Sequence, residues 1–222
     1  ATTNLDVDGA LIITATTGNI TQGSELAVGL TSTFTTSDAD ATITLNDDDN
    51  TFTGAVALNT NGSSGNATIK NDRAILLAAS TVGGAFSATA TAGNITQSSG
   101  ILTITGAATF ITTADDQSIV LDKNNVFTSH VTMRAGDGSA AFNDITFKDS
   151  GGVDLVSSAP SLAGKLFIDA TNNLAVGGNL SITATTGNIT QGGALDIEGT
   201  TTLVTLADDG TIDLKVGSIT TN

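Results

Sequence analysis

The chain of 222 residues contains no cysteine, no tryptophan and no tyrosine, and it has a single proline. The absence of cysteine excludes a disulfide framework and a structural zinc site held by thiolates, and it fits a chain exported without oxidative folding. The absence of tryptophan and tyrosine removes the aromatic platforms on which sugar rings stack. No segment approaches the ~18 consecutive apolar residues of a membrane-spanning helix. We therefore expect no membrane insertion.

Basic residues are also scarce. Seven Lys and Arg stand against 22 Asp and Glu, which gives a formal net charge of −15. Nucleic-acid binding needs clustered Lys and Arg on one face, so this class of partner is excluded. An acidic surface keeps a long β-structure soluble and discourages pairing with other sheets.

Threonine and glycine are abundant, with about 40 and 25 residues respectively. Apolar residues occur in short alternating clusters between Gly, Asn, Asp and Ser, without a helical period of useful length. β-Branched residues suit a pleated surface, and Gly and Asn supply the positive φ angles of sharp corners. The composition therefore predicts an all-β chain of short strands.

One pentapeptide, Gly-Asn-Ile-Thr-Gln, occurs three times. The copies lie at 18–22, 93–97 and 187–191, each inside a longer matching stretch with a Thr-rich lead-in and a later acidic turn. The intervals between copies are 75 and 94 residues, which differ by 19. Coils of a parallel β-solenoid have roughly 20 residues, so these intervals predict about four and five coils. Because an insertion must keep every strand in register, we expect the longer interval to contain one whole extra coil.

The predicted fold is a right-handed parallel β-helix (β-solenoid) with about 19–22 residues per coil, about three short strands per coil and roughly 11 coils. The first repeat has expected strands at 5–7, 11–14, 19–21, 26–28, 33–35 and 42–45; the second at 86–88, 94–96, 102–105, 109–111 and 118–121; the third repeats this scheme to 211–214. Phe52 and Phe127, each two residues after an Asn (Asn50 and Asn125), are expected to stack inside the solenoid.

The domain prediction is one continuous module over 1–222, with repeat units at approximately 5–79, 80–173 and 174–222. A solenoid has no internal domain boundary because each coil contacts only its neighbours. Both ends of the sequence are in phase with the repeat, and neither has a convincing polar capping coil. We therefore expect a segment of a longer array, or a protomer that stacks end to end on itself or on neighbouring repeats.

The repeats resemble those of large bacterial exoproteins of the filamentous-haemagglutinin and autotransporter-adhesin type. The resemblance rests on the Gly-Asn-Ile-Thr-Gln units, the Val-x-Gly segments before them, the Thr-rich strands and the stretch from Phe52 to Val56. It implies a right-handed parallel β-helix, secretion to the bacterial cell surface, and a stalk or adhesive-fibre role with a possible host, cell-surface or matrix receptor.

Calcium is the first candidate ligand. Asp47, Asp48 and Asp49 form the densest acidic run, and carboxylate oxygens suit Ca²⁺. The corresponding loop of the second repeat contains Lys123 in place of a carboxylate, and the Gly/Asp nonapeptide of calcium-loaded β-rolls is absent. The alternative for this run is a solvated turn.

Two further functions were weighed against the residues. A polysaccharide-active enzyme would need acidic and basic groups together; Asp144, Lys148, Asp149 and Arg134 lie near one another in sequence, and His130 replaces the Ala55 of the first repeat. Without aromatic platforms we expect no enzyme, and His130 is expected to be an incidental exposed residue.

Ice binding would need Thr-x-Thr on successive coils of one flat face. The pairs Thr14/Thr16, Thr89/Thr91 and Thr183/Thr185 lie several coils apart, and Val120 and Asp213 occupy the positions aligned with Thr44. We therefore expect a structural or adhesive solenoid of a secreted bacterial surface fibre or giant adhesin, with ice-binding or calcium-binding solenoids as the alternatives. The segment 156–161, which contains Pro160, is the best candidate for a receptor-contacting loop because proline must lie at a corner or bulge.

Overall fold

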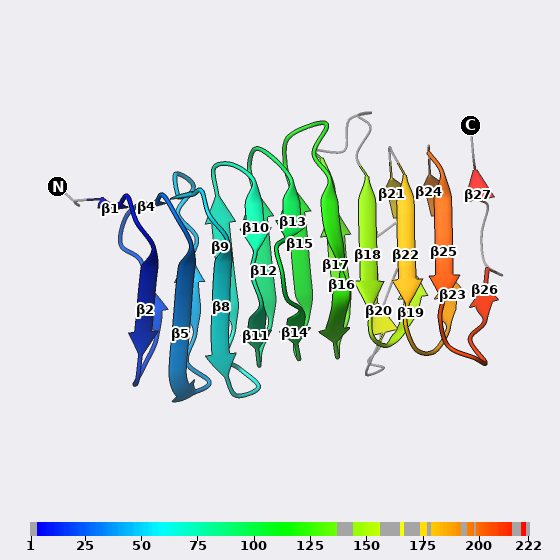
Figure 1. The fold of residues 1–222 in the computed structure, drawn as a ribbon, viewed down its shortest axis with the longest axis horizontal. Coiled ribbons are helices and arrows are strands. Elements are labelled where there is room, and N and C mark those ends of the chain that lie inside the picture. Colours follow the sequence, from blue (N-terminus) through cyan, green and yellow to red (C-terminus); the bar gives the residue numbers. More distant parts are fainter. Residues whose placement is uncertain are drawn as a thin grey trace.

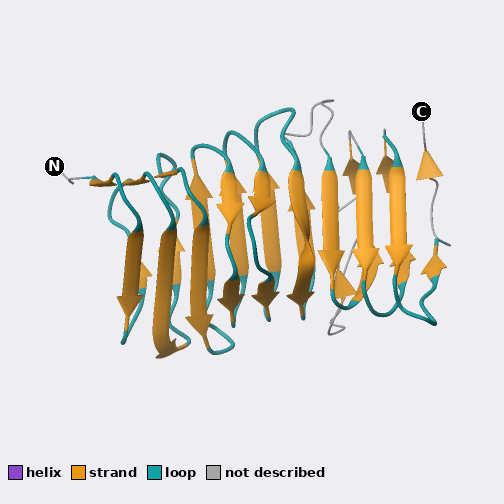
Figure 2. Cartoon of the chain, in the orientation of Figure 1, coloured by secondary structure: helices purple, strands orange, loops and turns teal. Residues whose placement is uncertain are grey.

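The computed structural model describes residues 4–136, 144–155, 165–166, 174–176, 179–191, 195–197, 199–214 and 219–220. Within these ranges every regular element is a β-strand (Figure 2). All strand pairs are parallel, and the coils lie side by side along the long axis of the molecule from β2 to β25 (Figure 1). The prediction of an all-β parallel solenoid is confirmed.

The strands form five sheets. Eleven strands make the longest sheet: β2 (Leu11–Ala15), β5 (Ser32–Ala39), β8 (Val56–Asn61), β10 (Ile75–Leu77), β11 (Ser80–Val82), β13 (Ile95–Gln97), β14 (Leu102–Ile104), β16 (Ile119–Phe127), β18 (Ile145–Asp149), β22 (Leu180–Ala184) and β25 (Thr201–Thr205). The six-stranded sheet contains β3 (Ile20–Thr21), β6 (Ile43–Leu45), β9 (Ala67–Asn71), β12 (Phe86–Ala90), β15 (Ala108–Thr112) and β17 (Val131–Arg134).

The other three sheets lie at the two ends. At the amino-terminal end, three strands pair: β1 (Leu5–Val7), β4 (Leu26–Val28) and β7 (Thr51–Phe52). At the carboxyl-terminal end, one sheet contains β19 (Gly152–Leu155), β20 (Lys165–Leu166), β23 (Ile189–Gln191) and β26 (Ile212–Asp213), and the other contains β21 (Leu174–Val176), β24 (Leu195–Ile197) and β27 (Ile219–Thr220).

Three strands per coil is the rule at both ends. β1, β2 and β3 are covered by β4, β5 and β6, and β22, β23 and β24 by β25, β26 and β27. In the middle, β10 and β11 of one coil both pair with β8, and the nine-residue β16 pairs with both β13 and β14. Two short strands therefore merge into one face there.

The number of coils is lower than predicted. The solenoid has about eight turns instead of eleven. From β1 to β18 the steps between paired residues range from 19 residues (Ala67 to Phe86) to 26 (Ile119 to Ile145), and the next coil has steps of 35 (Ile145 to Leu180) and 36 (Val153 to Ile189). Longer coils leave fewer of them in the same chain, and at ~4.8 Å per coil the rod is about 40 Å long.

The first interval between motif copies is three coils and one strand. Ile20 pairs with Ile43, Ile43 with Ala67, and Ala67 with Phe86. Ile95 of the second copy belongs to the next strand along the chain, β13. The interval is therefore somewhat shorter than the predicted length of about four coils.

The second interval has the same construction. Ile95 pairs with Ile119, Ile119 with Ile145, and Ile145 with Leu180, while Ile189 of the third copy lies on the following strand. The 19 additional residues do not form a whole extra coil of the stack. They lie mainly in the 35-residue step from Ile145 to Leu180, which contains one additional short strand, β20, paired with β19.

Because each copy begins one strand further on, the copies change sheets. The lead-in strand is β2 in the eleven-stranded sheet for the first copy, β12 in the six-stranded sheet for the second, and β22 in the eleven-stranded sheet again for the third. β22 stacks through β18 on the first half of β16, whereas the column of β2 leads through β14 to its second half, so each copy starts one strand later around the coil.

Inward-facing residues alternate with outward-facing ones along each strand and form one continuous apolar interior. Phe52 and Phe127 are both buried, as predicted. Each meets a phenylalanine of another strand edge to face, with ring centroids 6.0 Å apart: Phe52 against Phe34, and Phe127 against Phe110. Equivalent residues of the two repeats therefore fill the interior in the same way.

Candidate functional site

The repeated pentapeptide builds a corner between coils. Its glycine adopts a positive φ in all three copies, 75° at Gly18, 102° at Gly93 and 80° at Gly187. The asparagine that follows accepts a hydrogen bond through Oδ1 from a backbone N–H of the next coil. The donors are Thr42 to Asn19 at 2.8 Å, Ser118 to Asn94 at 2.8 Å and Thr211 to Asn188 at 2.9 Å. Glycine and asparagine therefore turn the chain and satisfy the amide above it.

The glutamine of the motif clamps a buried asparagine. Gln22 donates through Nε2 to Asn50 Oδ1 at 2.7 Å and accepts from Asn50 Nδ2 at 3.0 Å. Asn50, fully buried, also accepts from the N–H of Leu26 at 2.9 Å and donates to the carbonyl of Lys70 at 3.2 Å. One side chain thus ties together three successive coils.

The second repeat has the same clamp. Gln97 and Asn125 exchange hydrogen bonds of 2.8 and 3.0 Å, and Asn125 also accepts from Leu102 N–H at 2.9 Å and donates to the carbonyl of Lys148 at 3.2 Å. In the third repeat, Ile219 stands 28 residues after Gln191, where the first two repeats have asparagine. The constant interval of 28 residues is the sequence signal for this pair, which the motif and strand patterns alone did not predict.

The coil above each clamp carries a second buried polar side chain. Asn71 accepts from Phe52 N–H at 2.8 Å and donates to the carbonyls of Phe52 at 3.0 Å and Ala74 at 2.8 Å. Asp149 occupies the equivalent place above Phe127, whose N–H it accepts at 3.1 Å through Oδ1. Its Oδ2 accepts from the N–H of Gly151 at 3.1 Å.

Asp149 is only 1% exposed. Burial disfavours the charged form and raises the pKa of Asp149 to about 6, although hydrogen bonds from the backbone N–H groups of Phe127, Gly151 and Ser150 act in the opposite direction. A carboxyl group with this pKa titrates in mildly acidic solution. Asp149 acts inside the solenoid, where its carboxyl oxygens accept hydrogen bonds from backbone N–H groups.

The calcium candidates lie in an exposed loop between β6 and β7. Asp48 forms an ion pair with Lys70, and Asp47 Oδ1 accepts from the N–H of Asp49 at 3.1 Å. Over the ranges that the structure describes, no three His, Cys, Asp or Glu side chains form a group that could hold a metal ion. Calcium binding by these three aspartates therefore stays a hypothesis, and no group of metal ligands in the described ranges supports it.

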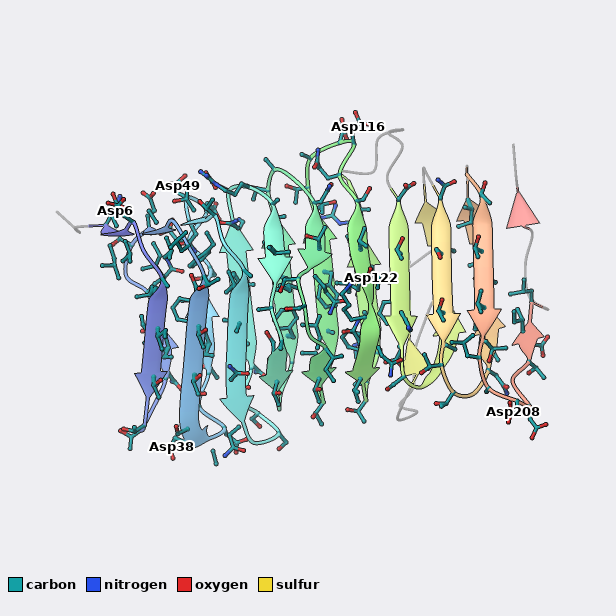
Figure 3. All side chains as sticks on the ribbon, in the orientation of Figure 1. Asp6, Asp38, Asp49, Asp116, Asp122 and Asp208 are labelled. Atoms are coloured by element: carbon teal, nitrogen blue, oxygen red, sulfur yellow. The ribbon has the colours of Figure 1, made fainter. Side chains whose placement is uncertain are left out.

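Acidic residues elsewhere are spread along the rod (Figure 3), and two of them make turns. Asp40 and Asp116 have positive φ angles of 63° and 57°. Aspartate tolerates this left-handed conformation better than most residues. Asp40 Oδ1 also accepts from the N–H of Ser64 at 2.8 Å. These acidic turns have a structural explanation.

The residues weighed for catalysis do not share a cleft. Arg134 ends β17 in the six-stranded sheet, whereas Lys148 and Asp149 belong to β18 in the eleven-stranded sheet. Asp144 accepts the N–H of Asn179 at 2.6 Å, which is the same corner role as that of the motif asparagines. His130 lies beside Ser129, with 3.4 Å between Nδ1 and Oγ.

Outward-facing threonines form rows across paired strands, and these rows do not follow the sequence alignment of the repeats. Thr44, Val120 and Asp213 lie in three different sheets, so comparing them says nothing about a flat face. The pairs that do stack give one outward rank of hydroxyls across the six-stranded sheet: Thr21, Thr44, Thr68, Ser87, Thr109 and Thr132. The next outward rank contains Lys70, Thr89, Ile111 and Arg134.

An apolar cavity of about 480 Å³ opens at the carboxyl-terminal end. Leu195, Ile197, Leu203, Ile212 and Leu214 line it, together with Gly199, Thr200 and Thr201. The predicted receptor loop at 156–161 lies outside the described residues.

The fold and the corner motif define a parallel β-solenoid repeat protein. A family model described as Repeats of unknown function (DUF5649) matches residues 1–59, 64–134 and 143–218, and each match contains one copy of the pentapeptide. The chain belongs to this family. No curated protein and no solved structure matches it. The described part of the chain has no helix that could cross a membrane.

Proposed function

We propose that the chain is a structural segment of a secreted bacterial surface fibre or giant adhesin, where it provides reach and stiffness. The observation that carries this proposal is that the coils of residues 4–136 stack on one another without interruption. Each coil continues the apolar interior of the last, and the buried amides of Asn50, Asn71 and Asn125 bond to neighbouring coils. Such a rod resists bending and unfolding because its strands are linked by continuous backbone ladders.

Adhesive contact is the second part of the proposal. The outward faces are rich in threonine, which offers hydroxyl groups without strong charge, and the acidic turns lie at the corners. A host, cell-surface or matrix receptor would meet these faces from the side of the rod. The resemblance to bacterial exoprotein repeats supports this placement at the cell surface.

The test is immunogold electron microscopy of intact source cells with antibodies raised against the folded chain. The proposal expects gold particles on material that projects from the cell surface, and loss of labelling after brief protease treatment of intact cells. Labelling that requires permeabilised cells would contradict it.

Ice binding is the alternative that one observation favours. Six hydroxyl residues on six consecutive coils form a straight rank on the six-stranded sheet. Coils spaced ~4.8 Å apart give such a rank a regular repeat. The neighbouring rank, with Lys70 and Arg134, interrupts the second row that a flat threonine array would need.

Thermal hysteresis separates the two functions. An ice-binding chain would depress the freezing point and lose this activity in Thr68→Lys and Thr109→Lys variants, with Thr14→Lys on the other sheet as the matched control. A structural segment would give no thermal hysteresis in any of these proteins.

A further inference from the structure

The hydrogen-bonded asparagine side chains of the solenoid fall into two classes. Asn50, Asn71 and Asn125 are fully buried, and each donates through Nδ2 to neighbouring groups. The asparagines of the second class are exposed at corners directly before β3, β9, β13, β22 and β23 (Figure 1). Each accepts a backbone N–H of the next coil through Oδ1, over 2.7 to 2.9 Å. These corner asparagines are Asn19, Asn66, Asn94, Asn179 and Asn188.

The corner contact fixes the orientation of each side-chain amide. A backbone N–H can only donate, so the atom that receives it is Oδ1, and Nδ2 takes the other position of the amide. Among the residues that the structure describes, none accepts a hydrogen bond from Nδ2 of a corner asparagine. The corner itself does not need this nitrogen, because the carboxyl group of Asp144 accepts the N–H of Asn179 in the same way.

The two classes also differ in the residue two positions later. All five corner asparagines begin an Asn-x-Ser/Thr tripeptide without proline, and their third residues are Thr21, Thr68, Thr96, Ser181 and Thr190. The buried asparagines have Phe52, Arg73 and Phe127 at that position. Outside the corners, only Asn61 begins such a tripeptide, and it is exposed at the end of β8.

The strand pattern explains the hydroxyl residue but not the amide. Each corner is followed by a buried residue and then by an outward one, and this also places Thr146 after Asp144 and Thr44 after Thr42. A carboxyl group satisfies the corner, and yet five of these six side chains are amides in a chain with 22 Asp and Glu. An exposed asparagine in this tripeptide is the acceptor for N-linked sugars.

We propose that the five corner asparagines are acceptor sites for N-linked glycosylation. The sugar comes from its diphosphate ester, a glycosyl donor that a transferase of the source cell uses. The bond between the anomeric carbon and the diphosphate oxygen breaks, and the diphosphate leaves with the electron pair. A bond from the anomeric carbon to Nδ2 forms, and Nδ2 loses one proton. Oδ1 is unchanged, so the hydrogen bond to the next coil persists in the product.

Burial sets the order of modification and folding. The middle residue of each tripeptide is at most 7% exposed, so a folded corner cannot enter a transferase active site as an extended peptide. The chain is therefore modified before it folds, and the fold then places the sugars along the sides of the rod. Asn19 and Asn66 start strands two spacings apart in the six-stranded sheet, which is roughly 10 Å. The coil-to-coil contacts remain free. This inference does not depend on the fibre role.

The test is mass spectrometry of proteolytic peptides from the chain purified from its source cells. Peptides with corner asparagines carry a sugar, which fragmentation places on the asparagine side chain. Peptides with Asn50, Asn71 or Asn125 carry none. Unmodified asparagine at all five corners overturns the proposal, and so does a sugar found only on the buried asparagines.

Variants of the third residue test whether the tripeptide directs the modification. In the source cells, Thr96→Val loses the sugar at Asn94, whereas Thr96→Ser keeps it. Thr44→Val is the matched control, since Thr44 has the same outward place on its strand but follows a corner threonine, Thr42. This control keeps all five sugars. A sugar that persists on Asn94 in Thr96→Val overturns the proposal.

Asn94→Asp separates the corner contact from the modification. It keeps an acceptor for the N–H of Ser118, as Asp144 does for Asn179, and it removes Nδ2. Produced without sugars, the variant unfolds at the same urea concentration as the unmodified wild type. Produced in the source cells, it lacks the sugar at this one position. A clear fall in the urea midpoint of the unmodified variant would show that the corner needs the amide itself, which overturns the argument from the free Nδ2.

Discussion

Asp149 is a carboxyl group in a place where the preceding repeat has an amide. Asn71 uses both a donor and an acceptor on the backbone around Phe52, whereas Asp149 only accepts as long as it is ionised. Its raised pKa of about 6 means that the folded chain binds this proton more tightly than the unfolded chain does. The stabilising contribution is fully present below the ordinary pKa of about 4 and is lost as the pH rises through 6.

The Asp149→Asn variant should lose this pH dependence. In the wild type we expect the free energy of unfolding to fall by up to about 3 kcal/mol between pH 4 and pH 7, since the pKa differs by about two units. In the variant that part of the slope disappears, while some stability is lost with the hydrogen bond to Gly151. Urea unfolding at several pH values measures both.

Asn71→Asp is the matched control for that prediction. It places a buried carboxyl group in the equivalent site of the first repeat and should add a fall in stability of the same sign over the same pH range. An unchanged pH slope in both variants would disprove the assignment to these two sites.

Close approach of the backbone between coils makes Gly106 intolerant of a side chain. A Cβ at Gly106 would overlap with the backbone of Gly84 and lie 2.6 Å from the N of Ala85. We expect Gly106→Ala to lower the free energy of unfolding by about 1–3 kcal/mol or more, because the overlapping atoms belong to rigid backbone.

Gly23 provides the control, since its Cβ position has no atom within 4 Å. Gly23→Ala should be neutral, or stabilising by about 0.4–1 kcal/mol through the unfolded state. Thermal melts of the two variants side by side suffice. A Gly106→Ala variant as stable as Gly23→Ala would show that the coils can separate locally at little cost.

At the scale of the strand and its corner, the clamp between Gln97 and Asn125 makes a specific prediction. Asn125→Ala removes the acceptor for the buried N–H of Leu102 and the partner of Gln97, so we expect a loss of about 2–3 kcal/mol. Gln97→Ala should cost less, because Gln97 is only partly buried. The double variant should then be less destabilised than the sum of the two single variants.

The equivalent clamp of the first repeat is the comparison within the chain. Gln22→Ala should lower the free energy of unfolding by about as much as Gln97→Ala, because Gln22 and Asn50 exchange the same two hydrogen bonds as Gln97 and Asn125. A loss of stability in only one of these two variants would mean that the clamp is not what the pentapeptide preserves.

The sequence predicted the strands well and their stacking poorly. Alternating apolar residues placed the strand at 26–28 correctly and the strand at 102–105 to within one residue. A match between two repeats, however, shows only that two residues have the same role at a corner. It does not show on which side of the rod that corner lies. The alignment of Thr44 with Val120 therefore suggested a shared face that does not exist.

The coil count failed for a related reason. Intervals of 75 and 94 residues were divided by a typical coil length, whereas the paired residues show three coils and one additional strand in each. The 35-residue step between Ile145 and Leu180 contains one strand more than the other coils, because β18 pairs with the strand four positions later, and dividing by a typical coil length does not reveal such a step. The buried pair of Gln and Asn could be predicted from the sequence only through the recurring interval between these two residues.

At the scale of the whole molecule, stability should be nearly additive along the rod. Each coil contacts only its neighbours. A chain shortened at one end therefore loses the stability of the removed coils and of the one interface between them and the remaining coils. We expect a fragment of residues 1–136, which contains the first six coils, to fold alone with a lower urea midpoint. Circular dichroism and amide hydrogen exchange test this. A fragment that is unfolded, or whose protected amides are not those of the paired strands, would contradict it.

The shift of each copy by one strand around the coil limits how a multivalent partner can bind. The lead-in strands of copies one and three, β2 and β22, are seven strand spacings apart in the order of their sheet, which is roughly 34 Å. They also lie in different columns of that sheet, because β22 stacks through β18 on the first half of β16 and the column of β2 leads to its second half. A partner with two arms gains avidity only if its linker spans both that distance and the offset between the columns, and a shorter linker leaves the second arm without a site.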